Sequence, residues 1–96
     1  MFEHIKEGPP SLMKFKDGRD TYTGVGNFSN GFSLSVVRHS GSYGGEQGLF
    51  EILLMRNDKP ISLPPITEEG DTIKGFLTEE QVNSIIADTR DLPGTF

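Results

Sequence analysis

Ninety-six residues, of which 33% are hydrophobic and 24% charged, are enough for one small domain with a single core, and we expect residues 1–96 to form that domain. The 14 acidic and 9 basic residues give a net charge of −5, which argues against nucleic acid as a direct partner because a phosphate backbone is held mainly by Lys and Arg. The chain has no cysteine, which excludes disulfides and thiolate zinc sites, and no apolar run approaches the roughly 20 residues of a membrane-spanning helix.

The first third of the chain is predicted to contain short elements. Residues 8–10 read Gly-Pro-Pro, which interrupts helices and central strands, so we expect a short strand or an arm before them. Residues 12–16 alternate apolar and basic side chains ahead of the turn dipeptide Asp17-Gly18, and we predict a strand there. A further short strand is predicted at residues 22–25.

The clearest strand signal lies at residues 32–36, where apolar residues alternate with serines. The dipeptide Asn30-Gly31 before it is typical of a hairpin turn. Residues 49–55 are more continuously apolar, which predicts a central strand that is covered on both faces or pairs with a partner chain. Residues 49–55 also carry more apolar side chains than one sheet face of a small domain readily covers. This predicts a homodimer, because homodimers often bury such surfaces.

The segments between this strand and the C-terminal helix give weaker signals. Residues 56–60 are predicted to form a turn. Residues 61–66 carry two prolines, which predicts an edge strand or an extended loop. Residues 73–76 are predicted as one more short strand.

The C-terminal helix has the sharpest boundary signals. Thr78 and Gln81 are spaced as a capping box, and Leu77 and Val82 occupy the flanking hydrophobic positions. A narrow apolar stripe follows, formed by Val82, Ile85, Ile86 and Thr89. We predict a helix over residues 78–91, packed on one face of a small, mainly antiparallel sheet of four to six strands, and therefore an α+β fold.

Four glycines and one tyrosine lie in the connection between the two central strands, residues 38–48. Glycine is favoured where φ must be positive or where another chain or a ligand comes close. One interpretation is a mobile surface hairpin, and the other is a recognition surface built around the tyrosine. Backbone amides at the paired glycines could also hold an anion. The candidate binding residues are Arg38, His39, Tyr43, Gly44, Gly45 and Glu46.

The acidic residues and histidines lack the spacing of a metal or acid–base site. Glu79 and Glu80 are interpreted as part of a helix N-terminus, where negative charge is favoured. The acidic residues at 68–71 are interpreted as a solvated loop that lacks the spacing of an EF-hand. His4 and His39 are far apart in sequence and show no metal-ligand spacing.

Nucleotide and nucleophile motifs have equally little support. Residues 24–27 resemble a fragment of a dinucleotide fingerprint and are interpreted as a turn. None of the serines lies in a nucleophile elbow. We therefore expect a protein that is not an enzyme and has no catalytic residues, metal or cofactor; an enzyme would need His39 or Glu51 buried in a pocket.

One set of residues between about positions 28 and 93 carries a resemblance to a group of proteins. It consists of Asn30-Gly31, Ser35-Val36-Val37, Ser42-Tyr43-Gly44-Gly45, Gly48-Leu49-Phe50-Glu51, Pro65-Ile66-Thr67, Gly75-Phe76-Leu77-Thr78 and Val82. In this set the chain resembles small uncharacterised accessory proteins of tailed bacteriophages. Proteins of this group carry no catalytic motif that could be transferred to this chain.

The resemblance implies a phage or prophage accessory protein that acts in the host cytoplasm. Small proteins of this class often block or sequester a host factor, including antiviral defence proteins such as a CRISPR effector. The partner implied is therefore a host protein. The net charge argues against nucleic acid as a partner, and the lack of a long apolar run argues against a membrane. The alternative is a small-molecule sponge, in which the glycine-rich loop holds a nucleotide signal.

Overall fold

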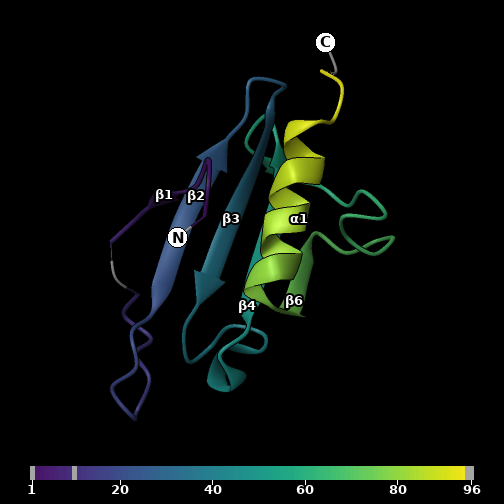
Figure 1. The fold of residues 1–96 in the computed structure, drawn as a ribbon. Helices are drawn as coiled ribbons and strands as arrows, with labels where there is room; N and C mark the ends of the chain where they lie inside the picture. The colour runs from purple at the N-terminus through teal and green to yellow at the C-terminus, as the bar shows by residue number, and fades with distance from the viewer. Residues whose placement is uncertain (1, 10, 95–96) are drawn as a thin grey trace.

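The computed structural model describes residues 2–9 and 11–94. In this part of the chain it confirms the α+β prediction, because a mainly antiparallel sheet of six strands carries the C-terminal helix on one face (Figure 1). The elements are β1 (Lys6–Glu7), β2 (Tyr22–Asn27), β3 (Phe32–Arg38), the short 3-10 helix η1 (Gly45–Gln47), β4 (Phe50–Arg56), β5 (Lys59–Pro60), β6 (Ile73–Leu77) and α1 (Glu79–Arg90). The strand order is β1-β2-β3-β4, and β4 then pairs with both β5 and β6.

The predicted helix and its capping box are confirmed. Thr78 is the N-cap, and its Oγ1 accepts from the Gln81 N–H at 3.2 Å while Gln81 Oε1 accepts from the Thr78 N–H at 2.8 Å. All four residues of the apolar stripe are buried. Within the described residues, no helix is long and apolar enough to cross a membrane.

The core lies between α1 and one face of the sheet, which we call the helix side. Alternate residues of the two central strands point into it, and Leu34, Ile52 and Leu54 are fully buried there. The N-terminal segment covers the part of this face that α1 does not reach. Phe2 packs edge-on against Tyr22 and Phe50, with ring centroids 5.4 and 5.1 Å away. The core is therefore built from alternate residues of the central strands, together with residues of α1 and the N-terminal segment.

The strand predicted at residues 22–25 is confirmed as part of β2, and the interpretation of residues 24–27 as a turn is wrong, because they lie inside the same strand. Gly24 and Gly26 face the N-terminal segment, which crosses this strand very closely. A Cβ on Gly24 would lie 2.6 Å from Ile5 Cγ2, and one on Gly26 would lie 2.6 Å from the His4 carbonyl oxygen. These glycines make room for a neighbouring backbone, which a local motif does not reveal.

The strand predicted at residues 12–16 is also wrong. These residues form turns and irregular backbone, with Phe15 buried and Leu12 exposed. A strand needs an open neighbour, and the position beside β2 is already taken by β1. The other boundary predictions hold more closely: residues 61–66 form a loop, and a turn at Asn57 and Asp58 joins β4 to β5.

The face of the sheet opposite α1, which we call the open face, is only partly covered. It carries Val25, Ser35, Leu53 and Ile73 side by side on four strands, and Val25 and Ile73 are 42% and 39% exposed. In the described part of the chain, β4 is covered on the helix side by α1 and the N-terminal segment, and the predicted covering of its other face is not realised. The predicted homodimer would bury the open face, and it stays a prediction that light scattering tests.

Asn30 connects the β2–β3 turn to the end of α1, a role that its turn motif did not indicate. Its Nδ2 donates to the carbonyl oxygens of Thr89 at 2.8 Å and Leu92 at 2.9 Å, and its Oδ1 accepts from the Phe32 N–H at 3.1 Å. The bond to Leu92 gives a donor to a carbonyl beyond the helix end, and the bond to Thr89 adds a donor beside the Leu92 N–H, which lies 3.3 Å from the same carbonyl oxygen.

We expect Asn30→Ala to lower the free energy of unfolding by about 2 kcal/mol, because the Leu92 carbonyl and the Phe32 N–H lose the hydrogen bonds that Asn30 makes to them. In a domain of this size that corresponds to a fall in Tm of roughly 10 °C by thermal unfolding. Ser29→Ala, at an exposed neighbour in the same turn, is the control and should shift Tm by about 2 °C or less. Equal Tm values for the two variants would contradict this role of Asn30.

Candidate functional site

The connection between β3 and β4 folds into a defined loop around η1. Ser42 Oγ accepts from the His39 N–H at 3.0 Å and donates to the His39 carbonyl at 2.9 Å. The Gly45 N–H donates to the Ser42 carbonyl at 3.1 Å, and the Leu49 N–H donates to the Gly44 carbonyl at 2.9 Å. These bonds favour a shaped surface over the interpretation as a mobile hairpin.

Three glycines of this loop are required by its geometry. Gly44 and Gly48 flank η1 with φ of 86° and 79°, which side chains rarely adopt. Gly45 is required for a different reason, since a Cβ there would clash with the carbonyl oxygen of His39. The Gly45 amide is already bonded within the loop, so an anion would have to compete for it.

Residues 13–19 support the loop from outside. The Ser40 N–H donates to the Met13 carbonyl at 3.0 Å. The Arg19 guanidinium donates to the Glu46 carbonyl at 3.1 Å and to the Asp17 carboxylate at 2.7 Å. Hydrogen bonds from the Arg19 backbone amide, and then from its side chain, hold the pKa of Asp17 below its usual value. Glu46 is therefore fixed at its backbone, and its exposed carboxylate also pairs with the Arg19 guanidinium at 3.7 Å.

Tyr43 is held by hydrogen bonds on both sides of its backbone, and its side chain is 61% exposed. Its N–H donates to Glu51 Oε1 at 2.9 Å, and its carbonyl accepts from the Phe76 N–H at 3.1 Å. Glu51 points to the open face, because its neighbours in β4 are buried on the helix side. Gly75 lies beneath Tyr43, where a Cβ would clash with the tyrosine Cβ.

Phe76 is the residue of this site that sequence reasoning missed. It has φ of 56°, and its side chain is 55% exposed. The pairing of β4 with β6 is irregular between Phe50 and Ile52, so Gly75 and Phe76 form a bulge opposite Glu51. In the sequence it is an aromatic residue after a glycine, which indicates a short strand and belongs to the resemblance but does not indicate a binding residue. We call the surface formed by Tyr43 and Phe76 the aromatic corner.

The remaining predicted residues have internal contacts. The Arg38 guanidinium lies 4.7 Å from the ring centroid of Phe50, on the helix side of the sheet. His39 Nδ1 accepts from the Gly41 N–H at 3.1 Å. The structure therefore places Arg38 on the face opposite the one that Glu51 and Tyr43 occupy. Of the six predicted binding residues, Tyr43 and Glu46 present exposed side chains.

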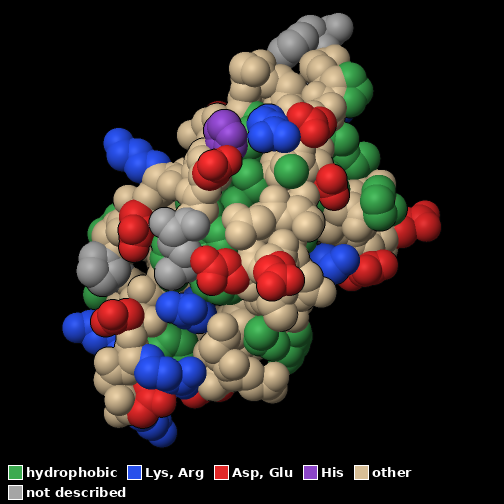
Figure 2. Space-filling model, in the orientation of Figure 1, with side chains coloured by type: hydrophobic (Ala, Val, Ile, Leu, Met, Phe, Trp, Pro, Cys, Tyr) green, Lys and Arg blue, Asp and Glu red, His purple; other side chains and the backbone are tan. Residues whose placement is uncertain are grey.

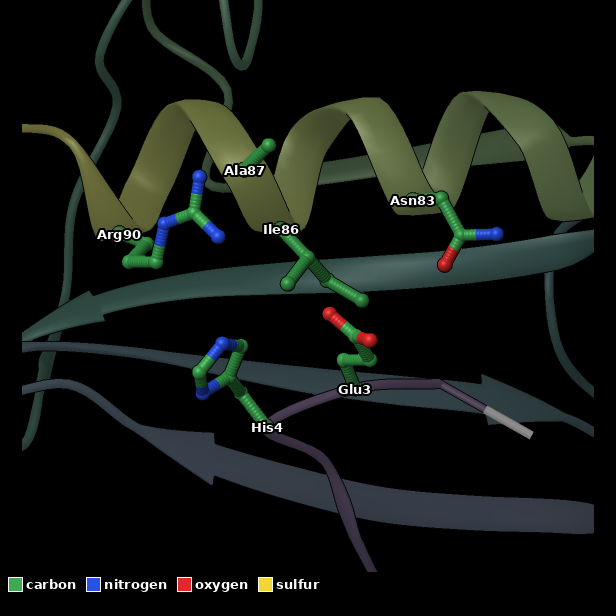
Figure 3. Close-up of a pocket in the computed structure, with 6 residues that line it drawn as sticks. All are labelled: Glu3, His4, Asn83, Ile86, Ala87 and Arg90. Atoms are coloured by element: carbon green, nitrogen blue, oxygen red, sulfur yellow. The ribbon is translucent and has the colours of Figure 1, made fainter.

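A separate polar groove of about 330 Å³ lies between the N-terminal segment and α1. Figure 3 shows Glu3 and His4 reaching from that segment towards the helix, which contributes Asn83, Ile86, Ala87 and Arg90. Arg90 Nε donates to Asp91 Oδ1 at 3.1 Å, and this bond raises the pKa of Arg90. The groove could hold a small polar molecule, but it is lined by residues 83–90 of α1, whereas Phe76 of the aromatic corner lies two residues before the N-cap of that helix.

Among the described residues, no group of three or more His, Asp or Glu side chains is placed to hold a metal ion. In the same part of the chain, every buried side-chain nitrogen or oxygen has a hydrogen-bond partner. No protein-family model, curated protein or solved structure matches the chain. The assignment of a site therefore depends on local geometry, and the aromatic corner is where that geometry is most unusual.

Proposed function

We propose that the protein is a non-enzymatic binding protein that docks a partner protein through the aromatic corner. The observation that carries this proposal is Phe76, a bulky residue held at φ of 56° with more than half of its side chain exposed. Left-handed backbone costs a residue with a side chain about 1 to 2 kcal/mol. Because the ring is largely exposed, its burial on folding contributes little free energy to offset this strain. The strain therefore points to a function of the ring.

A protein surface fits the aromatic corner better than a small ligand does. Tyr43 and Phe76 project from the surface, whereas small molecules are usually enclosed in concave sites. Large aromatic residues are enriched among the hot spots of protein interfaces. Here the backbones of both anchors are fixed in advance by the bond between them, which reduces the ordering cost of binding.

The partner that we propose is a host protein, in line with the resemblance to phage accessory proteins. The chain would block or sequester it in the host cytoplasm, and an antiviral defence protein such as a CRISPR effector is a suitable target. The net charge of −5 supports a protein partner over direct nucleic-acid binding.

The alternative, a sponge for a nucleotide signal, has weaker support. It placed the ligand in the glycine-rich loop, where the Gly45, Gly48 and Leu49 amides already donate to carbonyl groups of the same loop. Native mass spectrometry of the protein purified from infected and uninfected cells separates the two functions. We expect a co-purifying protein; a co-purifying small molecule without a protein would favour the sponge.

We expect Tyr43→Ala to weaken binding of the captured partner by about 2 kcal/mol or more, roughly 30-fold, which is typical of an aromatic anchor. Tm should change little, because the ring is 61% exposed and Ala keeps the Cβ that packs against Gly75. Val25→Ala, an exposed apolar site on β2, is the matched control. Calorimetry and thermal unfolding measure the two effects, and equal affinities for the two variants would contradict the role of Tyr43.

A further inference from the structure

The outer side of β6 is a free strand edge. The Leu54 N–H donates to the Thr72 carbonyl at 3.1 Å, so Thr72 turns its backbone towards β4. Backbone groups alternate in direction along an antiparallel strand, and the N–H and C=O of Ile73 therefore point away from β4. In the described part of the chain the sheet ends here, because no strand pairs with β6 on that side.

This edge is better suited to pairing than the opposite one. At the opposite edge, β1 has two residues and is followed by Gly8 and Pro9. β6 has five residues and no proline, and the exposed side chain of Ile73 lies on the same face as the backbone of Tyr43. An unpaired edge with apolar neighbours is a template for an added strand. An added strand could pair with β6 only as far as the bulge at Gly75 and Phe76.

Acidic residues flank β6 at both ends. Glu68, Glu69 and Asp71 precede it, and Glu79 and Glu80 follow it. Lys74 is the single basic residue between positions 60 and 89, and it already pairs with Glu68 at 3.5 Å. Figure 2 shows acidic side chains gathered at the right-hand margin of the molecule, where Figure 1 places the loop before β6. Two copies of such an edge would repel each other, whereas a basic segment would be attracted.

We propose that the partner protein binds as an extended segment that adds a strand to the β6 edge and carries Lys or Arg residues opposite the acidic flanks. Main-chain hydrogen bonds to Ile73 would hold the segment, and the aromatic corner would receive its next apolar side chain. This inference rests on the proposed function, because it names the binding mode and partner chemistry of the same site. It excludes self-pairing through β6.

The probe is a short synthetic peptide of alternating Val and Lys, and a Val and Glu peptide of equal length is the control. We expect the Lys peptide to bind, to slow hydrogen exchange of the Ile73 amide, and to bind more weakly as salt is raised. The Glu peptide should not bind. Failure of the Lys peptide to bind at millimolar concentration would overturn the inference, as would protection of the open face in place of Ile73.

Ile73→Pro removes the edge N–H at the first position of the strand, where proline is tolerated, and Ile73→Val keeps it. We expect the Pro variant to bind the peptide about tenfold more weakly, because it loses one backbone hydrogen bond, and the Val variant to bind as the parent does. If the Pro variant does not fold, slowed exchange of the Ile73 amide tests strand addition, and Glu69→Lys combined with Asp71→Lys tests the charge attraction and should weaken binding and flatten its salt dependence. Unchanged binding in the folded variant would overturn strand addition.

The captured partner separates this inference from the proposed function. Loss of the partner with both Tyr43→Ala and Ile73→Pro supports strand addition. Loss with Tyr43→Ala alone overturns strand addition and leaves the proposed function intact. Retention by both variants overturns both. A dimer of the free protein with a protected Ile73 amide would show that a second copy occupies the edge, which also overturns the inference.

Discussion

Phe76→Gly is expected to abolish or strongly weaken partner binding while leaving the free energy of unfolding unchanged or raising it by about 1 kcal/mol. Glycine adopts φ of 56° without the Cβ penalty that Phe76 bears, and the lost ring is more than half exposed. The greater freedom of glycine in the unfolded chain offsets part of this gain. Urea unfolding and calorimetry with the captured partner measure the two quantities.

Phe76→Ala is the matched control for backbone strain. It also removes the ring but keeps the Cβ, so it should bind as poorly as Phe76→Gly and be about 1 kcal/mol less stable than that variant. A strongly destabilised glycine variant would show that the ring supports the fold. Unchanged binding would show that the strain at this position has no role in docking.

Gly45→Ala is expected to lower the free energy of unfolding by about 3 kcal/mol, at the upper end of overpacking effects. The added Cβ would meet the His39 carbonyl oxygen and the Ser42 Oγ, the atoms that form the hydrogen bonds of the turn. A backbone carbonyl cannot move aside as a flexible side chain can. The corresponding fall in Tm is roughly 10 °C or more, measured by thermal unfolding.

Gly48→Ala tests the other requirement for glycine in this loop, which is a positive φ without close packing. Gly48 has φ of 79° and no atom within 4 Å of an added Cβ, so the cost should be limited to about 1 kcal/mol of backbone strain. Equal free energies of unfolding for Gly45→Ala and Gly48→Ala would contradict the close packing around Gly45. Because Gly45 shapes the loop, its substitution tests the fold of the site and does not isolate a contact with the partner.

The elements that could be predicted from the sequence are those with local causes. The capping box at Thr78 and the alternation at residues 32–36 each involve neighbours in sequence, and both are confirmed. The strand predicted at residues 12–16 failed because the position beside β2 belongs to β1. Gly24 and Gly26 were misinterpreted because their reason, the crossing N-terminal segment, lies about 20 residues away in sequence.

In the candidate site, too, the residue with a local signal could be predicted and the residue that depends on distant contacts could not. Tyr43 was found because one large aromatic residue stands out among small residues in its own loop. Phe76 was missed because its exposure and its left-handed backbone arise from the bulge against β4, which depends on pairing between distant strands. The two residues meet only when β6 brings Gly75 beneath the loop.

The most direct test of the account is quantitative capture from infected cells, with native mass spectrometry of the eluted complexes. The bait is the parent protein, the double variant Tyr43→Ala/Phe76→Gly, or the control Val25→Ala. We predict a complex of defined stoichiometry with one host protein for the parent and the control, and none for the double variant. The same complex with all three baits would contradict the aromatic corner as the docking surface.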